Sequence, residues 1–243
     1  MNQPREVVVT GGGTGIGYAT AALFAKQGDR VTITGRRERV LADAAVMLGA
    51  SYAAFDAADP AAVTAALAEL PERVDVLVNN AGGNTDLVAE PPPEGDLAAL
   101  AASWRANLDA NVLTAVLVTE ALRPRLADHA RIVTIGSIAA RSGAGSYGAA
   151  KAAIEAWTAD LAGALGPRGI TANVVSPGLT EDTEFFHGRL SAERRRALAE
   201  STLNKRAGTP EDVAETVYFL SGRGARHVTG QVVHVNGGAF LGR

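Results

Sequence analysis

The chain has 243 residues, 47% of them hydrophobic and 20% charged, which suits one large α/β domain or two small ones with a sizeable core. A net charge of -3 without blocks of like charge excludes the basic field that holds nucleic acid. The absence of cysteine excludes disulfides, thiolate metal sites and cysteine nucleophiles. The first residues contain no apolar signal core and no run is long enough to cross a bilayer, so we expect a cytoplasmic protein without membrane contact.

Short β-branched runs alternate with alanine-rich segments along the chain. The runs are almost entirely apolar, which is typical of strands buried on both faces. Strands are predicted at residues 6–10, 30–34, 74–82, 130–137, 170–178 and 231–238, with a weaker candidate at 51–55. Crossover helices are predicted at 17–27, 60–70, 97–126, 147–165 and 210–220. This alternation predicts a doubly wound, Rossmann-type parallel sheet of about seven strands with helices on both faces, in a single domain over residues 1–243.

The region from residue 179 to 205 interrupts this alternation and is predicted to form a substrate lid. It contains a charged helix candidate at 191–200 and two adjacent phenylalanines, but no strand-like run. Phe185 and Phe186 contact either an apolar substrate or the core, and the core is favoured. Four arginines form either a docking surface for an acidic acyl carrier protein or, as is more common, a solvated helix face: Arg189, Arg194, Arg195 and Arg196.

A glycine-rich turn follows the first predicted strand and opens the first helix, in the run VVVTGGGTGIGY. Glycines allow a tight turn and a close approach of backbone N–H groups to a pyrophosphate, to which the helix N-terminus adds its dipole. Because Tyr18 stands where G-x-G-x-x-G needs its last glycine, the run fits T-G-x-x-x-G-I-G instead. The predicted cofactor contacts of this turn are Gly11, Gly13, Thr14, Gly15, Ile16 and Gly17.

The end of the second predicted strand indicates which dinucleotide is bound. Gly35 stands where NAD-binding sheets carry an acidic residue for the ribose 2′-hydroxyl, and Arg36 and Arg37 follow it. A guanidinium binds a 2′-phosphate through two hydrogen bonds, whereas a carboxylate would repel it. NADP(H) is therefore favoured over NAD(H), and the alternative is that both arginines only begin a solvated helix. The glycine turn lacks the basic residue that some NADP enzymes carry, since Thr14 precedes Gly15.

Six motifs in chain order resemble those of the short-chain dehydrogenase/reductase family: TGGGTGIG, FDAAD, NNAGG, IVTIGS, SYGAAK and NVVSPG. The resemblance covers essentially the whole chain, and the C-terminal third closely resembles 3-oxoacyl-acyl-carrier-protein reductases. It implies a catalytic set of Asn111, Ser137, Tyr147 and Lys151, of which Tyr147 and Lys151 also touch the cofactor. The further cofactor contacts that it implies are Asp56, Ala57, Asn80, Ala81, Gly82, Pro177, Gly178 and Thr180, with Thr183 as an alternative to Thr180.

The spacing of Tyr147 and Lys151 places both side chains on one face of a helix. A free tyrosine has a pKa of about 10, and a neighbouring ammonium and a cationic nicotinamide each lower that pKa. The phenol is therefore predicted to donate the proton that follows hydride transfer, while Ser137 donates a hydrogen bond to the substrate oxygen. Lys151 is also expected to bind the nicotinamide ribose. By the resemblance, Asn111 holds a water that links Lys151 to solvent, and no metal site is predicted.

Alternatives stay open at two of these positions. Asn107 lies one turn before Asn111, which is favoured because the run VLTAVLVT follows it, and an asparagine here could also satisfy a helix kink. The segment before the predicted catalytic tyrosine is shorter than is common in the family, so Ser142 or Ser146 competes with Ser137. Ser137 is favoured because it ends a predicted strand, where a serine could also serve only as a cap.

These features together predict an NADP(H)-dependent oxidoreductase that reduces a carbonyl, such as a 3-oxoacyl or polyketide-like substrate, either free or bound to a carrier protein. The alternatives are an alcohol or sugar dehydrogenase working in the oxidative direction and a non-catalytic dinucleotide-sensing protein. Relatives usually form tetramers through two long helices, here 97–126 and 147–165, whose small alanine-rich faces suit close helix approach. A homotetramer or homodimer is therefore expected.

Overall fold

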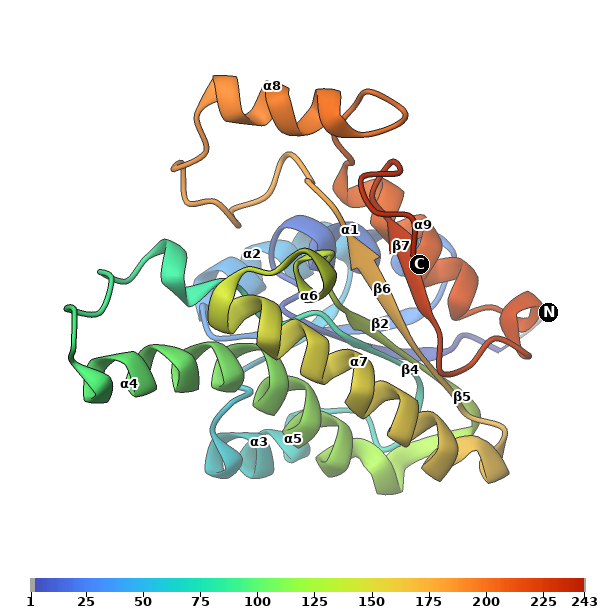
Figure 1. The fold of residues 1–243 in the computed structure, drawn as a ribbon. Helices are drawn as coiled ribbons and strands as arrows, with labels where there is room; N and C mark the ends of the chain where they lie inside the picture. Colours follow the sequence, from blue (N-terminus) through green and yellow to red (C-terminus); the bar gives the residue numbers. More distant parts are fainter. Residues whose placement is uncertain (1–2, 243) are drawn as a thin grey trace.

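The computed structural model describes residues 3–242, and its centre is one sheet of seven parallel strands (Figure 1). The strands run in the order β3-β2-β1-β4-β5-β6-β7, so the direction of winding reverses between β1 and β4. Their bounds are β1 Glu6–Thr10, β2 Arg30–Gly35, β3 Ser51–Ala54, β4 Val74–Asn79, β5 Leu126–Ile135, β6 Thr171–Pro177 and β7 Val232–Val235. The predicted doubly wound parallel sheet is confirmed.

Two strands differ from the predicted ranges in an informative way. β4 ends at Asn79 rather than at residue 82, because the backbone N–H groups of Asn80 and Ala81 bond to the Thr10 hydroxyl instead of to a neighbouring strand. β5 begins four residues before the predicted range, at Leu126, where it first pairs with Val74 and then passes through an irregularity.

The helices connect successive strands and cover both faces of the sheet. Their bounds are α1 Gly15–Lys26, α2 Glu38–Leu48, α3 Pro60–Ala66, α4 Leu97–Leu108, α5 Thr114–Leu122, α6 Ala139–Ser142, α7 Gly145–Leu165, α8 Ala192–Ser201 and α9 Pro210–Leu220. The sequence prediction omitted α2 and treated 97–126 as one helix. In the structure a π-helical segment, Asp109–Leu113, separates α4 from α5.

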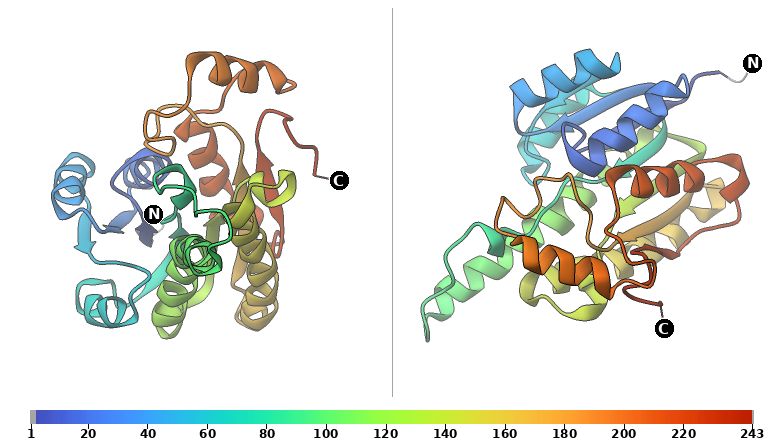
Figure 2. Two further views of the ribbon diagram at one scale, coloured as in Figure 1. Left: turned by 60° about the vertical axis from the view of Figure 1, so that its left-hand side comes forward. Right: turned by 90° about the horizontal axis from the view of Figure 1, so that it is seen from above.

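The two faces of the sheet bury separate hydrophobic clusters. Val7 and Val9 of β1 pack with Phe24 of α1 on one face, whereas Val8 packs with Leu122 of α5 on the other. Successive side chains of a strand point to opposite faces, so a strand covered on both sides must be apolar throughout. Figure 2 shows the consequence, with α1, α2 and α9 on one side of the sheet and α3, α5 and α7 on the other.

The segment between β6 and α9 lies outside this three-layer body. It contains α8, which has no buried residue and lies beyond the end of β6 (Figures 1 and 2). Within residues 3–242, no helix combines the length and the apolar character that crossing a bilayer requires.

Candidate active site

The carboxyl ends of β1, β4, β5 and β6 bring the predicted site residues to one edge of the sheet. In open α/β sheets ligands bind at this edge, where the strand order reverses. The turn after β6 lies directly beside the turn after β5, because the Ile138 N–H donates to the Pro177 carbonyl at 3.1 Å. The parallel sheet therefore assembles one site from motifs that lie far apart in the sequence.

The glycine turn is closed too tightly for larger residues. Gly11 adopts the left-handed conformation at φ 64°, and a Cβ there would lie 2.8 Å from the Asn80 amide nitrogen. A Cβ on Gly17 would collide with the Gly11 carbonyl oxygen. The turn leads straight into α1, whose first turn contains no acidic residue. A bare turn of this shape at a helix N-terminus fits the pyrophosphate of a dinucleotide.

Asn80 holds the glycine turn in place. Its side-chain amide donates to the carbonyl oxygens of Thr10 at 3.0 Å and Gly11 at 3.1 Å. It was predicted to contact the cofactor, and in the structure its amide hydrogens are already used by the turn. Ala81 lies beside it, with its N–H on the Thr10 hydroxyl and its carbonyl accepting a bond from Thr114.

The predicted adenine contacts follow β3. The Asp56 carboxylate is exposed and accepts the Ala58 N–H at 2.9 Å, which fixes the turn that follows the strand. Ala57 buries its methyl group in the core cluster beneath the sheet, so only its backbone is available for a ligand.

The two arginines after β2 differ in their surroundings. Arg36 is exposed, whereas the Arg37 guanidinium forms an ion pair of 2.6 Å with Glu184, from the segment after β6. The Arg37 side-chain N–H groups hold both carboxylate oxygens, at 3.4 Å and 2.6 Å. The sequence analysis did not single out Glu184, because an acidic residue in the run TEDTE carries no distinguishing pattern.

Tyr147 and Lys151 lie on the same face of α7, as predicted. The Lys151 ammonium is 5.9 Å from the centre of the Tyr147 ring and donates to the Ile135 carbonyl, at the end of β5, at 2.8 Å. Both side chains are buried, with 6% and 5% of their surfaces exposed. The hydrogen bond to β5 fixes the lysine against the sheet rather than against the phenol.

The pKa values of this pair correct one expectation. Burial raises the pKa of Tyr147 to about 12, although its hydrogen bond with Ser137 acts in the opposite direction. Burial also lowers the pKa of Lys151 to about 8. The prediction of a lowered tyrosine pKa is therefore wrong for the chain alone, because loss of hydration outweighs the hydrogen bond with Ser137.

Ser137 lies between the end of β5 and the short helix α6. Its Oγ accepts the Ala139 N–H at 3.1 Å, which leaves the hydroxyl hydrogen available for donation. Its competitors are used elsewhere: the Ser142 hydroxyl donates to the Ile138 carbonyl, and the Ser146 hydroxyl donates to Asp86. Of the three serines, only Ser137 has a resolved effect on the pKa of Tyr147, which supports the choice made from the sequence.

Asn111 is held inside the π-helical segment. Its Nδ2 donates to the carbonyls of Gly83 at 2.8 Å and Asn107 at 2.9 Å, and its Oδ1 accepts the Gly83 N–H at 3.2 Å. Asn111 thus connects the helix to the loop that follows Gly82. The helix-kink alternative is confirmed, since the residue lies at a real irregularity of the helix, and the role of Asn111 in holding a water stays a prediction.

Asn107, the competing asparagine, has a separate structural position. It is fully buried, accepts the Thr85 N–H at 3.1 Å, and donates to Ser146 at 2.8 Å. Ser146 in turn donates to the Asp86 carboxylate at 3.0 Å. This chain of bonds connects the loop after β4 to the start of α7, and the sequence analysis did not foresee it.

The turn after β6 contains the remaining predicted contacts. The Gly178 N–H bonds to the Val235 carbonyl at 3.1 Å, and Thr180 is buried with its hydroxyl 3.4 Å from the Gly178 carbonyl. Thr183 lies farther along, where its methyl group would be 3.4 Å from a Cβ placed on Gly15. The two threonines considered from the sequence therefore occupy different places, one against β6 and one over the glycine turn.

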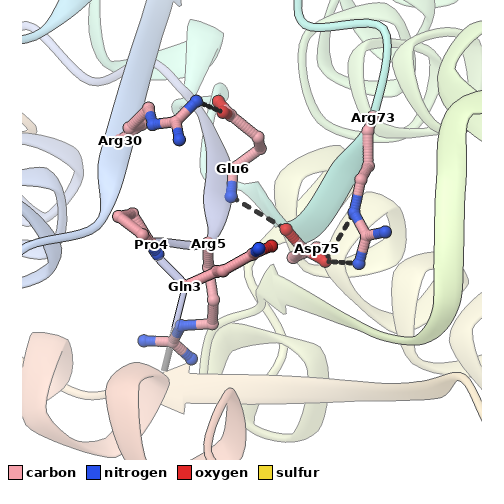
Figure 3. Close-up of a pocket in the computed structure, with 7 residues that line it drawn as sticks. All are labelled: Gln3, Pro4, Arg5, Glu6, Arg30, Arg73 and Asp75. Carbon is pink, nitrogen blue, oxygen red and sulfur yellow. Dashed lines mark hydrogen bonds and ion pairs between the residues drawn. The ribbon is translucent and has the colours of Figure 1, made fainter. Parts of the chain in front are cut away.

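A second cluster of charged residues lines a hollow at the opposite edge of the sheet (Figure 3). Arg30 pairs with Glu6 at 2.8 Å and Arg73 with Asp75 at 2.7 Å. Because each arginine already has a carboxylate partner and the hollow lies at the amino ends of the strands, it is not the dinucleotide site.

A doubly wound sheet with a glycine turn, and a buried Tyr–Lys pair beside a strand-end serine, define a dinucleotide-binding oxidoreductase. Residues 11–239 match the protein family described as enoyl-(acyl carrier protein) reductase. The chain is 36% identical over 255 residues to the short-chain reductase protein NovJ of Streptomyces niveus, covering 98% of this chain and 95% of NovJ. It is 32% identical to the 3-oxoacyl-acyl-carrier-protein reductase FabG of Escherichia coli strain K12, with 98% of each chain covered.

A solved structure agrees with these relatives. The crystal structure of a short chain dehydrogenase from Burkholderia cenocepacia in complex with NADP is 34% identical, with a TM-score of 0.82 and 97% of both chains covered. The chain belongs to the short-chain dehydrogenase/reductase family.

Proposed function

We propose that the protein is an NADP(H)-dependent reductase of a ketone carbonyl, acting on 3-oxoacyl or polyketide-like substrates. The observation that carries the proposal is the convergence of Ser137, Tyr147 and Lys151 at the carboxyl edge of β5, within reach of the glycine turn. A dinucleotide sensor needs the glycine turn but has no use for a phenol held beside a serine hydroxyl and an ammonium.

In this proposal the chain's residues manage the proton while the bound nicotinamide supplies the hydride. Tyr147 donates its proton to the carbonyl oxygen as that oxygen gains charge. The Ser137 oxygen accepts the Ala139 N–H, and in this proposal its hydroxyl hydrogen, which bonds with Tyr147 in the chain alone, is donated to the substrate oxygen. A developing alkoxide is a strong base, so a neutral phenol of high pKa still serves as its acid.

Lys151 and Asn111 support this step. The lysine gives one N–H to the Ile135 carbonyl and retains two for the ribose hydroxyls of a cofactor. Its ammonium also favours the phenolate that remains after proton transfer. Asn111 fixes Gly83 at the end of the site, and the water that relatives hold at this asparagine would connect Lys151 to solvent.

Two observations support NADP(H) over NAD(H). Arg36 and Arg37 follow β2 where an acidic residue would otherwise exclude a 2′-phosphate, and the matched Burkholderia cenocepacia structure is a complex with NADP. Reduction of a carbonyl is the direction that a reduced NADP pool favours. The similarity to FabG supports an acyl substrate on a carrier protein, for which the exposed arginines of α8 offer a basic surface.

Association through α4 completes the proposal. Four large apolar side chains recur along one side of this helix, which projects from the body of the molecule (Figure 1): Leu97, Leu100, Trp104 and Leu108. An apolar stripe at this spacing needs a partner surface. We propose a homodimer or homotetramer in which a second copy covers it, in a cytoplasmic protein.

The test is oxidation of NADPH and NADH, followed by absorbance, with 3-oxoacyl thioesters, simple ketones and an enoyl thioester as acceptors. We expect turnover of the 3-oxoacyl thioester with NADPH. Arg36→Ala should weaken NADPH binding by about tenfold and NADH binding hardly at all, because only NADPH carries the 2′-phosphate. Equal losses with both cofactors contradict the cofactor assignment, and oxidation of alcohols without reduction of any ketone contradicts the proposed direction.

A further inference from the structure

Three consecutive side chains of the segment between β6 and α8 cross the cofactor site. Thr183 lies over Gly15 in the glycine turn, Glu184 reaches Arg37, and the Phe185 ring is 5.6 Å from the Tyr147 ring. These contacts join residues that are far apart in the chain, since Arg37 and Glu184 are 147 positions apart. The segment therefore touches the turn for the pyrophosphate, the basic pair and the proton donor at once.

Glu184 holds Arg37 as an anionic ligand would. Both carboxylate oxygens accept hydrogen bonds from the guanidinium, and one of them also lies 3.5 Å from the Thr14 hydroxyl at the start of α1. The hydrogen bond from Arg37 lowers the pKa of the Glu184 carboxyl, so the group is ionised at neutral pH. The two residues that bond to the Glu184 carboxylate, Arg37 and Thr14, therefore belong to the two segments that the proposed function assigns to cofactor binding.

A carboxylate and a phosphate can each present a pair of oxygens to a guanidinium, and one pair of guanidinium N–H groups donates to only one such pair at a time. We propose that Glu184 competes with the 2′-phosphate of NADP(H) for Arg37, and so limits the affinity and specificity of the chain for the phosphorylated cofactor. This inference rests on the proposed function, in which Arg36 and Arg37 recognise that phosphate.

The ion pair between Arg37 and Glu184 is weak enough for an incoming 2′-phosphate to displace Glu184. The side chains of Arg37 and Glu184 are each 58% exposed, and exposed pairs of this kind contribute little because water and salt screen them. Arg36 is exposed and not engaged by Glu184, which leaves it available for the first contact with an incoming phosphate. Displacement of Glu184 would then release the segment over the glycine turn and complete the binding of the cofactor.

The experiment is a fluorescence titration of NADPH and NADH into the full chain and its variants. Glu184→Gln removes the competing charge and should tighten NADPH binding by about two- to fivefold, with less effect on NADH. Glu181→Gln is the matched control, since it removes the same charge three residues earlier from a side chain that contacts Arg195 rather than Arg37. We expect no change in NADPH affinity for this control.

A double variant decides the mechanism. In an Arg37→Ala background, Glu184→Gln should give no gain in NADPH affinity, because the contested guanidinium is gone. Any of three results would overturn the inference. These are a gain in NADPH affinity that persists in the Arg37→Ala background, equal gains in affinity for NADPH and NADH, and an unchanged NADPH affinity in Glu184→Gln. The proposed cofactor preference fails separately, if the wild-type chain binds NADH more tightly than NADPH or if Arg37→Ala affects both equally.

Discussion

The two sides of the candidate site differ in how firmly the fold holds them. On the side of β5 and α7, Tyr147, Lys151 and Asn111 keep only 6%, 5% and 2% of their surfaces exposed. Lys151 bonds to the end of β5, Asn111 to neighbouring backbone and Tyr147 to Ser137. On the side of β2 and the segment before α8, Arg37 and Glu184 are each 58% exposed and hold only each other and Thr14. The groups proposed for proton transfer are fixed, whereas the groups proposed to bind or compete with the 2′-phosphate are loosely held.

This difference separates two requirements of a reductase. Proton transfer needs donor and acceptor held in one geometry, which burial and strand-end bonding provide. Cofactor exchange needs contacts that break and form again on each turnover, which exposed ion pairs provide at small energetic cost. Variants on the buried side should therefore have large effects and variants on the exposed side small ones.

Tyr147→Phe should produce the largest effect. Removal of the hydroxyl deletes the proposed acid and should lower kcat by about 10²- to 10⁴-fold, while the Kd for NADPH changes little. Steady-state kinetics and a cofactor titration measure the two quantities. Unchanged turnover would remove Tyr147 from the mechanism, and a parallel loss of NADPH binding would indicate a structural role instead.

Lys151→Met should remove activity and yet stabilise the fold. Burial lowers the pKa of Lys151 from 10.5 to about 8, and that shift corresponds to a stability cost of up to about 3 kcal/mol at neutral pH. The unfolded chain keeps this proton up to about pH 10.5 whereas the folded chain releases it near pH 8. Wild-type stability should therefore rise relative to the variant between pH 8 and 10.5.

Urea unfolding of the wild type and Lys151→Met at several pH values measures this difference. The variant should start with the larger free energy of unfolding at pH 7, and the gap should close as the pH rises. A variant that is less stable than the wild type at pH 7 would show that the ammonium's bond to Ile135 outweighs its loss of hydration.

Arg141→Ala should destabilise the fold by about 2 kcal/mol. Arg141 of α6 pairs at 2.5 Å with Glu155 of α7, whose side chain is only 7% exposed. The substitution therefore leaves a nearly buried carboxylate without its charged partner. The pair also connects the segment after Ser137 to the helix that carries Tyr147. Arg123→Ala is the control, because it breaks an exposed pair with Glu120 and should cost less than about 1 kcal/mol. Equal losses of stability in Arg141→Ala and Arg123→Ala, measured by thermal unfolding, would contradict the distinction between the nearly buried pair and the exposed one.

Arg195→Ala on α8 should have the smallest effect. Its contact with Glu181 is 3.8 Å long and both side chains are well exposed, so thermal stability should stay within about 0.5 kcal/mol of wild type. The same variant examines the proposed basic docking surface, since weaker turnover with a carrier-bound substrate, but not with a small thioester, would place the carrier on α8. A marked loss of stability would show that α8 is held more firmly than its exposure indicates.

The sequence predicted the fold and the buried side of the site well, for physical reasons. Apolar strands that alternate with helices admit few arrangements, and because the strands are parallel, the loops that follow them meet at one edge of the sheet. Ser137 follows a strand, and Tyr147 and Lys151 lie in the first two turns of a helix, so their places follow once the elements are known. The sequence offered a helix kink at Asn111 but could not specify its π-helical form, because the bonds of Asn111 to Gly83 depend on the folded structure.

The exposed side was harder to foresee. Glu184 meets Arg37 through a segment that lacks periodicity, and a contact across 147 residues leaves no local signal in one sequence. The direction of the Tyr147 pKa was also wrong, since it depends on how completely the fold removes water from the phenol. Spacing shows which groups are neighbours but not how deeply they are buried.

The π-helical turn contains one residue more than the helix around it needs. A π-turn holds one residue more than an α-helical turn, so losing one residue of Asp109–Leu113 would restore ordinary winding. Because the wide turn absorbs the extra residue, the helices on either side would keep their faces, with Val118 and Leu122 in the core and Asn107 beside Ser146. The deletion would instead remove the local widening that lets Asn111 bond to Gly83. A single-codon deletion here would therefore spare the fold and disturb the candidate site.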